Sequence, residues 1–458
     1  MVSHLTKHAL CLLLLSCLGT TLMQAQNDLS SLMLVNSWQN MNVNPALQPN
    51  GIVVNLPGIY NNLSITNITF NDLLVEEGGR QILDISNAID QMGAQNFLRE
   101  DLDIETIGLG VQFGALGRNI GHRLRFNALI DYPKTLAQLI WEGNAQFIGE
   151  TVSFGPAFDL TAYHEFAIGA SYQLGENIKF GGRVKFLSGA ANVNTERNDL
   201  ELTTSGDVYQ LEMNADYVVN SAGSLSYDGL RDVNLDFNFG NFSTEELFGG
   251  NSGMAFDLGV AVKFDRLQIA VSAIDLGADL TWDQGVSNFT LDGLYEFEGL
   301  DIAQDLLDNE ESFGSIVDSL YATYDPVETN RSYTTSIGAK YYFSGQYELN
   351  NEISVGLIGY TDDYRNVSTT GLAVTGSINF SPLLRVGAFY GLRNERFDNL
   401  GANATISLGP VRLLLATDNI ISAFRPEDAH LANFRIGANL QFGQDKEQLD
   451  TSNGNRFF

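Results

Sequence analysis

The sequence predicts an all-β fold, a transmembrane antiparallel β-barrel of about 14–16 strands with helical inserts in its loops or lumen. The first observation is that apolar residues recur at every second position over segments of roughly 9–11 residues, the length of a tilted spanning strand. The second is that no stretch of about 20 apolar residues follows the N-terminus, which excludes the helical membrane class. The third is the contrast of 45 Gly with only 9 Pro among 458 residues, which suits tightly packed strands joined by turns.

The N-terminus has the pattern of a cleaved signal peptide covering residues 1–25. Lys7 and His8 precede the apolar run Ala9 to Leu15, and Met23-Gln24-Ala25 offers a small-residue cleavage site. A lipoprotein signal at Leu14-Leu15-Ser16-Cys17 is an alternative, although Leu15 fits that motif poorly. The signal predicts export, and with the barrel it predicts the outer membrane of a Gram-negative cell.

Cysteine content and charge exclude several function classes. Cys11 and Cys17 both lie in the predicted signal, so a mature chain has no disulfide, thiolate metal site or cysteine nucleophile. The formal net charge of −30 argues against nucleic acid as a partner, because phosphates would be repelled.

Residues 26–50 are predicted to form a plug-like segment. They are too apolar to hang free in the periplasm, yet alternate too poorly for a spanning strand. Asn44-Pro45 and Gln48-Pro49 interrupt pairing, since proline cannot donate a ladder hydrogen bond. We expect the segment to lie in the periplasmic half of the lumen, with Trp38 as its apolar anchor and Asn44 and Pro45 as further plug residues.

The predicted barrel covers residues 51–443 and is followed by a polar tail, 444–458. The segment Asn433 to Gly443 shows the pattern best: Phe434, Ile436, Leu440 and Phe442 share one face, and Arg435, Asn439 and Gln441 the other. Glycines, amides and lone bases on the polar side favour a crowded, hydrated lumen over the open face of a soluble sheet.

Further strands are predicted at Ile107 to Phe113, Arg123 to Ile130, Ala162 to Leu174, Asn177 to Leu187, Ala255 to Phe264, Leu267 to Asp275, Tyr333 to Phe343, Ile353 to Tyr360, Leu372 to Phe380, Leu384 to Tyr390, Ala402 to Leu408 and Val411 to Thr417. Weaker strands are predicted near Ile52, Ile65, Val208 and Val233. Asn71 to Asp101, Tyr132 to Glu150 and Leu300 to Tyr324 are predicted to be outer-loop or plug inserts with helical character. Tight turns are predicted at Gly175-Glu176, Asp265-Arg266, Ser381-Pro382 and Gly409-Pro410.

Basic residues are concentrated on the polar faces of the strands. A charge facing lipid at mid-membrane costs about 2–4 kcal/mol, so these side chains are predicted to point into the lumen. There they could pair with acidic groups such as Asp257, hold the plug, or attract an anionic head group; internal pairing is the favoured hypothesis. The lumen candidates are Arg123, Arg125, Lys179, Arg183, Lys185 and Arg435.

No residue pattern predicts an enzyme or a cofactor site. His164 could be imagined as a base beside Tyr163 and Glu165, but a histidine at the barrel girdle is the more common arrangement. Metal-binding histidine spacings and phosphate-binding glycine loops are missing from the sequence. The acidic run Asp301 to Glu311 could gather calcium, but it lacks the calcium-loop pattern and better fits a solvated face.

Four segments resemble known outer-membrane barrels. AIGASYQLGENIKFGGRVKFLSG (Ala167 to Gly189) and GMAFDLGVAVKFDRLQIAVSAIDLGADLTW (Gly253 to Trp282) resemble hairpins of long-chain fatty-acid-transporter-like barrels and of PorV-type barrels of type IX secretion. ATDNIISAFRPEDAHLANFRIGANLQFG is similar to their closing hairpin and to that of PorP-like barrels. MNVNPALQPNGIVVNLPG (Met41 to Gly58) resembles the opening of an uncharacterised, related barrel family. No ligand-binding residue of these families can be matched position by position.

The resemblance implies a transport channel for amphipathic or hydrophobic small molecules. The alternative is a non-transporting barrel that acts as a docking component for secretion, gliding or surface attachment. The expected partners are outer-membrane lipid and lipopolysaccharide, together with a hydrophobic small-molecule ligand or a secretion or surface protein. Fold-level likeness alone does not choose between these functions.

Overall fold

The structure is a computed structural model that describes residues 29–443, apart from 78–79, 207–209, 224, 228–232, 236–249, 298–325, 366 and 394–395. The predicted signal peptide, the insert Leu300 to Tyr324, the strand near Val208 and the polar tail lie outside the described residues. None of the described helices is long and apolar enough to cross a membrane.

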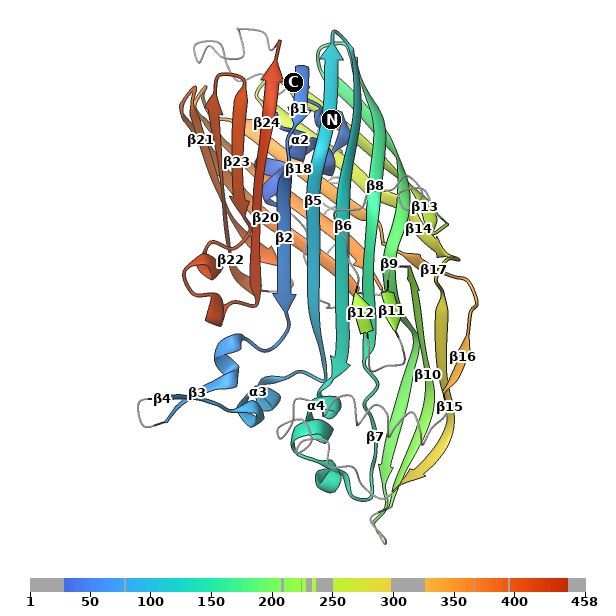
Figure 1. The fold of residues 1–458 in the computed structure, drawn as a ribbon. Coiled ribbons are helices and arrows are strands. Elements are labelled where there is room, and N and C mark those ends of the chain that lie inside the picture. The colour runs from blue at the N-terminus through green and yellow to red at the C-terminus, as the bar shows by residue number, and fades with distance from the viewer. Residues whose placement is uncertain are drawn as a thin grey trace, which may run out of the picture.

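Among the described residues, fourteen antiparallel strands close into a barrel (Figure 1). The ring closes where β1 and β2, which together form one wall strand interrupted at Leu56-Pro57, pair with β24 on one side and β5 on the other. The wall strands are β1 (Gly51–Asn55) with β2 (Gly58–Ile65), β5 (Gln95–Phe113), β6 (Leu116–Pro133), β8 (Ala157–Leu174), β9 (Ile178–Thr204), β13 (Ser252–Phe264), β14 (Leu267–Trp282), β17 (Tyr333–Ser336) with β18 (Lys340–Glu348), β19 (Ile353–Tyr364), β20 (Val367–Ser381), β21 (Leu384–Arg393), β22 (Arg396–Leu408), β23 (Val411–Thr417) and β24 (Leu431–Phe442).

The two ends of the barrel differ. The N and C labels lie at one end in Figure 1, which is also the end of the tight turns β5–β6, β8–β9, β13–β14, β20–β21 and β22–β23. Gly114, Gly175, Asp265 and Gly409 have positive φ in four of these turns, a conformation typical of hairpin turns of two or three residues. The predicted tight turns are thus confirmed, and short turns mark the periplasmic end of outer-membrane barrels.

The opposite end carries the inserts. Between β2 and β5 are η3 (Phe70–Leu73), the hairpin β3 (Leu74–Glu77) and β4 (Arg80–Leu83), and α3 (Ile85–Gln91). Between β6 and β8 are α4 (Lys134–Trp141), η4 (Asn144–Phe147) and β7 (Thr151–Ser153), as the helical spacing there predicted. Two short 3₁₀ turns, η5 (Ile421–Ala423) and η6 (Pro426–Asp428), connect β23 to β24, and β11 (Leu225–Tyr227) pairs with β12 (Val233–Leu235).

One part of the insert prediction was wrong. Gln95 to Asp101, assigned to the loop Asn71 to Asp101, belongs to β5 and pairs with β6. The insert was assigned from its helical spacing, but Arg99 and Asp101 at its end alternate as strand residues and are buried on the inner face of the barrel.

A small sheet extends from β9 beyond the barrel. Over Ala191–Thr204, β9 exchanges its partner β13 for β10 (Leu211–Gly223), and β10 pairs with β15 (Ser287–Phe297), which pairs with β16 (Val327–Thr329). Figure 1 shows β10 and β15 reaching past the barrel at the end opposite the N and C labels. Leu202, Leu211, Met213 and Ala215 pack on one face of this extension.

The wall alternates as predicted. In β24, Phe434, Ile436 and Phe442 are exposed on the outside, whereas Arg435, Asn439 and Gln441 are buried inside. Many other large apolar side chains are exposed on the outer surface, among them Ile107, Leu258 and Val374. A closed barrel with an apolar outside and a polar inside has the construction of Gram-negative outer-membrane proteins.

Candidate functional site

The interior of the barrel contains the N-terminal segment. Residues 29–50 form η1 (Ser30–Met33), α2 (Trp38–Val43) and η2 (Pro45–Leu47), and nearly all of them are buried. Ser37 caps α2 by accepting a hydrogen bond from Asn40 N–H, and Pro45 begins η2 at a helix start, where proline fits. Figure 1 shows α2 inside the half of the barrel that holds the N and C labels.

Glycines on the inner wall provide the space for this segment. Gly108 of β5 and Gly121 of β6 are paired, and Trp38 lies against both; a Cβ would come within 2.3 Å and 2.5 Å of its ring. Pro45 lies against Gly181 of β9 in the same way, because a Cβ at Gly181 would come within 2.2 Å of the Pro45 carbonyl carbon. Any side chain at these positions would therefore displace the segment, which explains why glycine recurs on the polar faces of the strands.

Gly181 and Gly182 do not open the wall. Both are paired with β8 on one side and β13 on the other, so the described strands have no lateral gap at this point. Gly181 instead makes room for Pro45 on the inside, and Gly182 faces outward.

Hydrogen bonds fasten the uncharged segment to polar and charged groups of the wall. Trp38 N–H donates to Asn439 Oδ1 at 3.0 Å, and Gln39 and Asn42 donate to the Glu105 carboxylate at 2.5 Å and 3.0 Å. Arg183 donates to the Asn42 side-chain and backbone oxygens at 2.9 Å and 3.0 Å. The segment itself, residues 29–50, contains no charged residue.

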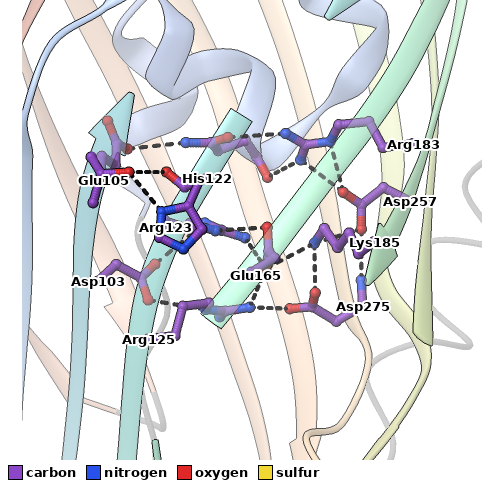
Figure 2. A network of polar contacts seen from close by, with 12 residues as sticks. Asp103, Glu105, His122, Arg123, Arg125, Glu165, Arg183, Lys185, Asp257 and Asp275 are labelled. Carbon is purple, nitrogen blue, oxygen red and sulfur yellow. Dashed lines mark hydrogen bonds and ion pairs between the residues drawn. The ribbon is translucent and has the colours of Figure 1, made fainter. Parts of the chain in front are cut away.

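A network of buried charges lies beside the segment (Figure 2). Lys185 Nζ lies 2.6 Å from Asp275, 2.8 Å from Asp257 and 3.6 Å from Glu165, and its side chain is fully buried. Arg125 Nη1 lies 3.0 Å from Asp275 and 3.2 Å from Glu165. The network thus joins β6, β8, β9, β13 and β14, and the buried charges compensate one another inside the wall, as burial in low dielectric requires.

The six lumen candidates all lie on the inner face. Arg123 binds Glu165 with two bonds of 2.8 Å, Arg183 binds Asp257 at 2.8 Å, and Arg435 binds Glu105 at 3.1 Å. Arg125 and Lys185 belong to the central network described above. Lys179 differs, because its ammonium donates to the Gln48 carbonyl and to Gln112 Oε1, both at 2.7 Å.

The structure also places the three plug candidates. Trp38 lies on Gly108 and Gly121, Pro45 on Gly181, and Asn44 caps η2 through a hydrogen bond from Ala46 N–H at 2.9 Å. The Asn44 amide also donates to the Val271 carbonyl at 3.1 Å.

Sequence reasoning missed most of the acidic partners. Asp103, Glu105, Glu165 and Asp275 are buried on the inner face beside the bases. Glu165 could have been found, because its place in the period-two pattern of β8 puts it on the inner face. Asp275 could not be found that way, because β14 is irregular there: Asp275 and Gly277 have positive φ, and the register against β13 shifts nearby.

The inner wall has a second, apolar side. Ile274, Tyr342, Ile358, Tyr360, Ala373 and Phe389, from β14 and β18 to β21, form one buried cluster with Leu29, Leu32, Met33 and Val43 of the N-terminal segment. The segment therefore lies between a charged side of the lumen and an apolar side.

The histidine considered as a base lies outside the lumen. His164 stacks on His122 with ring centroids 5.3 Å apart, and the two rings face Thr106 and Phe166 on the outer face of the wall. Thr106 Oγ1 lies 2.8 Å from His122 Nδ1 and 3.0 Å from the His122 carbonyl oxygen, so this cluster bonds within itself on the outer face. Within the described ranges, no group of three or more His, Cys, Asp or Glu residues could hold a metal ion.

Residues 45–418 match the model of a family described as a family of unknown function (DUF5723). The chain belongs to this family. A search of curated proteins found no match.

Several solved membrane barrels are similar in architecture. They include the toluene transporter TbuX of Ralstonia pickettii (10% identity, TM-score 0.42, 88% of this chain and 94% of that chain), a FadL homologue of Pseudomonas aeruginosa (11%, 0.39, 88% and 93%) and the toluene transporter TodX of P. putida (10%, 0.39, 89% and 94%). Identities this low do not transfer a substrate to the chain.

Proposed function

We propose that the protein is a Gram-negative outer-membrane transport barrel for amphipathic or hydrophobic small molecules, in which residues 29–50 act as a plug. The observation that carries this proposal is the two-sided lumen: an uncharged segment covers an apolar inner wall on one side and a charged wall on the other. Export by a signal peptide at residues 1–25 and residence among outer-membrane lipid and lipopolysaccharide are parts of the same proposal.

The apolar side of the lumen favours a substrate with a hydrocarbon part. The side chains of Tyr342, Ile358, Tyr360 and Phe389 are buried in one cluster with Leu29, Leu32 and Met33 of the plug. Withdrawal of the plug would leave an apolar surface inside an otherwise polar lumen, and such a surface binds hydrocarbon in preference to water.

The way in which the plug is held suits reversible release. Most buried charges of the wall pair with one another, and the plug makes its polar contacts with the wall through amide, hydroxyl and backbone groups, some of which bond to Glu105, Lys179 and Arg183. Because the plug contains no charged side chain, moving it breaks no ion pair between plug and wall. Water can replace the hydrogen bonds that the plug loses.

Two linked variants test the plug. Deletion of Gln26 to Met41 removes Trp38 and the apolar cover, so single-channel conductance in planar bilayers should rise. A reversible form uses the contact between Ala46 of the plug and Ala261 of β13, which pack together. A disulfide between Ala46→Cys and Ala261→Cys should stop uptake of a labelled fatty acid, and reductant should restore it.

The controls separate gating from folding. Ala261→Cys alone cannot tether the plug and should transport normally under oxidising conditions. Uptake that is unaffected by the oxidised tether, in a barrel that is shown to be folded, would rule out the plug as a gate.

A second candidate function is docking, and the sheet extension favours it. One face of β9, β10 and β15 beyond the barrel carries Asp199 opposite Asp216, which in turn lies opposite Asp292. Arg197 pairs with Asp216 at 2.7 Å, so this row of three carboxylates keeps a negative charge that a cationic partner would stabilise further. The resemblance of the hairpins to PorV- and PorP-type barrels supports the same alternative. Neutralising Asp199 and Asp292 should then weaken attachment of a secretion or surface protein and leave uptake unchanged.

A further inference from the structure

The outer face of the barrel wall has a hollow that the proposed transport route does not use. It lies across β5, β6, β8, β9 and β13 and has a volume of about 1040 Å³. Its lining is mainly apolar, and it opens outward rather than into the lumen.

The pairing register explains the hollow. One row of cross-strand neighbours contains small residues at its centre; it consists of Val111, Arg118, Ala170, Gly182 and Leu258. We call it the hollow row. The next row toward the loop inserts is built from large side chains: Leu109, Ile120, Ile168, Val184 and Phe256.

The row on the other side, toward the tight turns, is also large: Phe113, Leu116, Tyr172, Phe180 and Val260. Ala170 and Gly182, which are paired, thus form the floor of a groove between two ridges. The groove crosses five strands, or roughly 19 Å at about 4.8 Å per strand. Such a length and shape fit an extended hydrocarbon chain.

A single charge lies in this apolar setting. Arg118 is the only charged residue of the three rows, and its side chain is exposed. It lies two residues from Leu116, where β6 begins after the tight turn, and Phe113, Tyr172 and Phe180 flank it on the turn side. Aromatic residues at the end of barrel strands mark the membrane interface, so the guanidinium is at the depth of lipid head groups.

We propose that the hollow row is a binding site for one phospholipid of the periplasmic leaflet, with an acyl chain along Ala170 and Gly182 and the phosphate on Arg118. Arginine matches a phosphate with two parallel hydrogen bonds, and near the apolar floor such a bond is strengthened by the low dielectric. This site requires the barrel to lie in a membrane, but it does not depend on transport through the lumen.

Charge complementarity favours a phospholipid over a second copy of the barrel. A second barrel on this face would bury Arg118 against apolar side chains and would remove its hydration without supplying an anion. A phospholipid supplies the anion and the hydrocarbon together.

The test compares lipid retention by the full-length wild-type barrel and three variants, extracted from nanodiscs of phosphatidylglycerol and phosphatidylcholine and measured by native mass spectrometry. Gly182→Leu fills the groove; the new Cβ would meet only ordinary contacts, 3.6 Å from the Asp257 carbonyl oxygen and 3.8 Å from Leu258. Gly376→Leu is the matched control, an outward glycine of β20 with open space around it. Arg118→Gln removes the charge alone.

The wild-type barrel and Gly376→Leu should each retain one phospholipid, and Gly182→Leu should lose it. Arg118→Gln should weaken retention about tenfold, the effect of one charge-assisted hydrogen bond. Equal retention by all forms would overturn the site, as would dimers that disappear in Gly182→Leu while no lipid is retained. Retention that is unchanged in Arg118→Gln would overturn the role given to the phosphate.

Discussion

Lys185 offers the sharpest test of the charged network. Its ammonium lies within 3.6 Å of three carboxylates, those of Asp257, Asp275 and Glu165. Lys185→Met removes the cation and leaves these carboxylates in a buried setting. Breaking a buried ion pair costs about 3–5 kcal/mol. Because Arg183 and Arg125 still pair with Asp257 and Asp275, we expect the low end of that range.

A double-mutant cycle isolates the interaction itself. Asp275→Asn removes one of the carboxylates, so its cost and that of Lys185→Met should not add; the coupling should be at least about 1 kcal/mol. Lys179 is a matched control, since it is also a buried inward lysine of β9 but contacts Gln48 and Gln112 instead. It lies six residues, or roughly 20 Å, along the strand from Lys185.

Urea unfolding of the barrel in detergent, followed by tryptophan fluorescence, measures each corner of the cycle. Lys179→Met and Asp275→Asn should be additive within about 0.5 kcal/mol. If the Lys185 and Lys179 cycles give the same coupling, the carboxylates are not held by Lys185 and the compensation argument fails.

Two further predictions concern the plug seat and the outer face. Gly108→Ala puts a Cβ within 2.3 Å of the Trp38 ring, so it should displace the plug and raise single-channel conductance. In Gly110→Ala the nearest atoms lie 3.7 Å from the new Cβ, so conductance should not change. Equal conductance of the two variants would contradict the contact between Trp38 and Gly108. Ile436→Arg puts a charge on the lipid face, which costs about 2–4 kcal/mol, and should reduce the fraction of barrel that runs as the folded, heat-modifiable band. Phe424→Arg, in the outer loop, should assemble normally.

The fold could be predicted because strand alternation survives in a single sequence. The faces of β24 follow directly from Phe434, Arg435 and Ile436, since a charge cannot face lipid at low cost. The number of strands was less certain, because β1 and β2 are separate short segments that together make one wall strand.

Two acidic residues of the site, Glu105 and Asp275, could not be predicted for a geometric reason. In β5 the register shifts between Glu105 and Ile107, so that Thr106 is an extra residue. Counting in twos from the outward Ile107 would place Glu105 outside, but the bulge turns it inward to Arg435. Asp275 reaches Lys185 through the similar irregularity of β14. A bulge adds one residue to a strand, and the alternation of apolar and polar residues alone does not show where it occurs.

The plug and the network follow from one arrangement of the β5–β6 ladder. On the inner face, moving away from the tight turn, the pair Gly108 with Gly121 is followed by Glu105 with Arg123 and then by Asp103 with Arg125. The glycine pair admits Trp38, and the charged pairs that follow leave no room for an apolar group without its own polar partner. Gln39 and Asn42 are those partners, because their amides reach Glu105. The β5–β6 ladder therefore fixes how deep the segment lies in the lumen. The Trp38 ring packs on the glycine pair, and the amides of Gln39 and Asn42 bond to the Glu105 carboxylate.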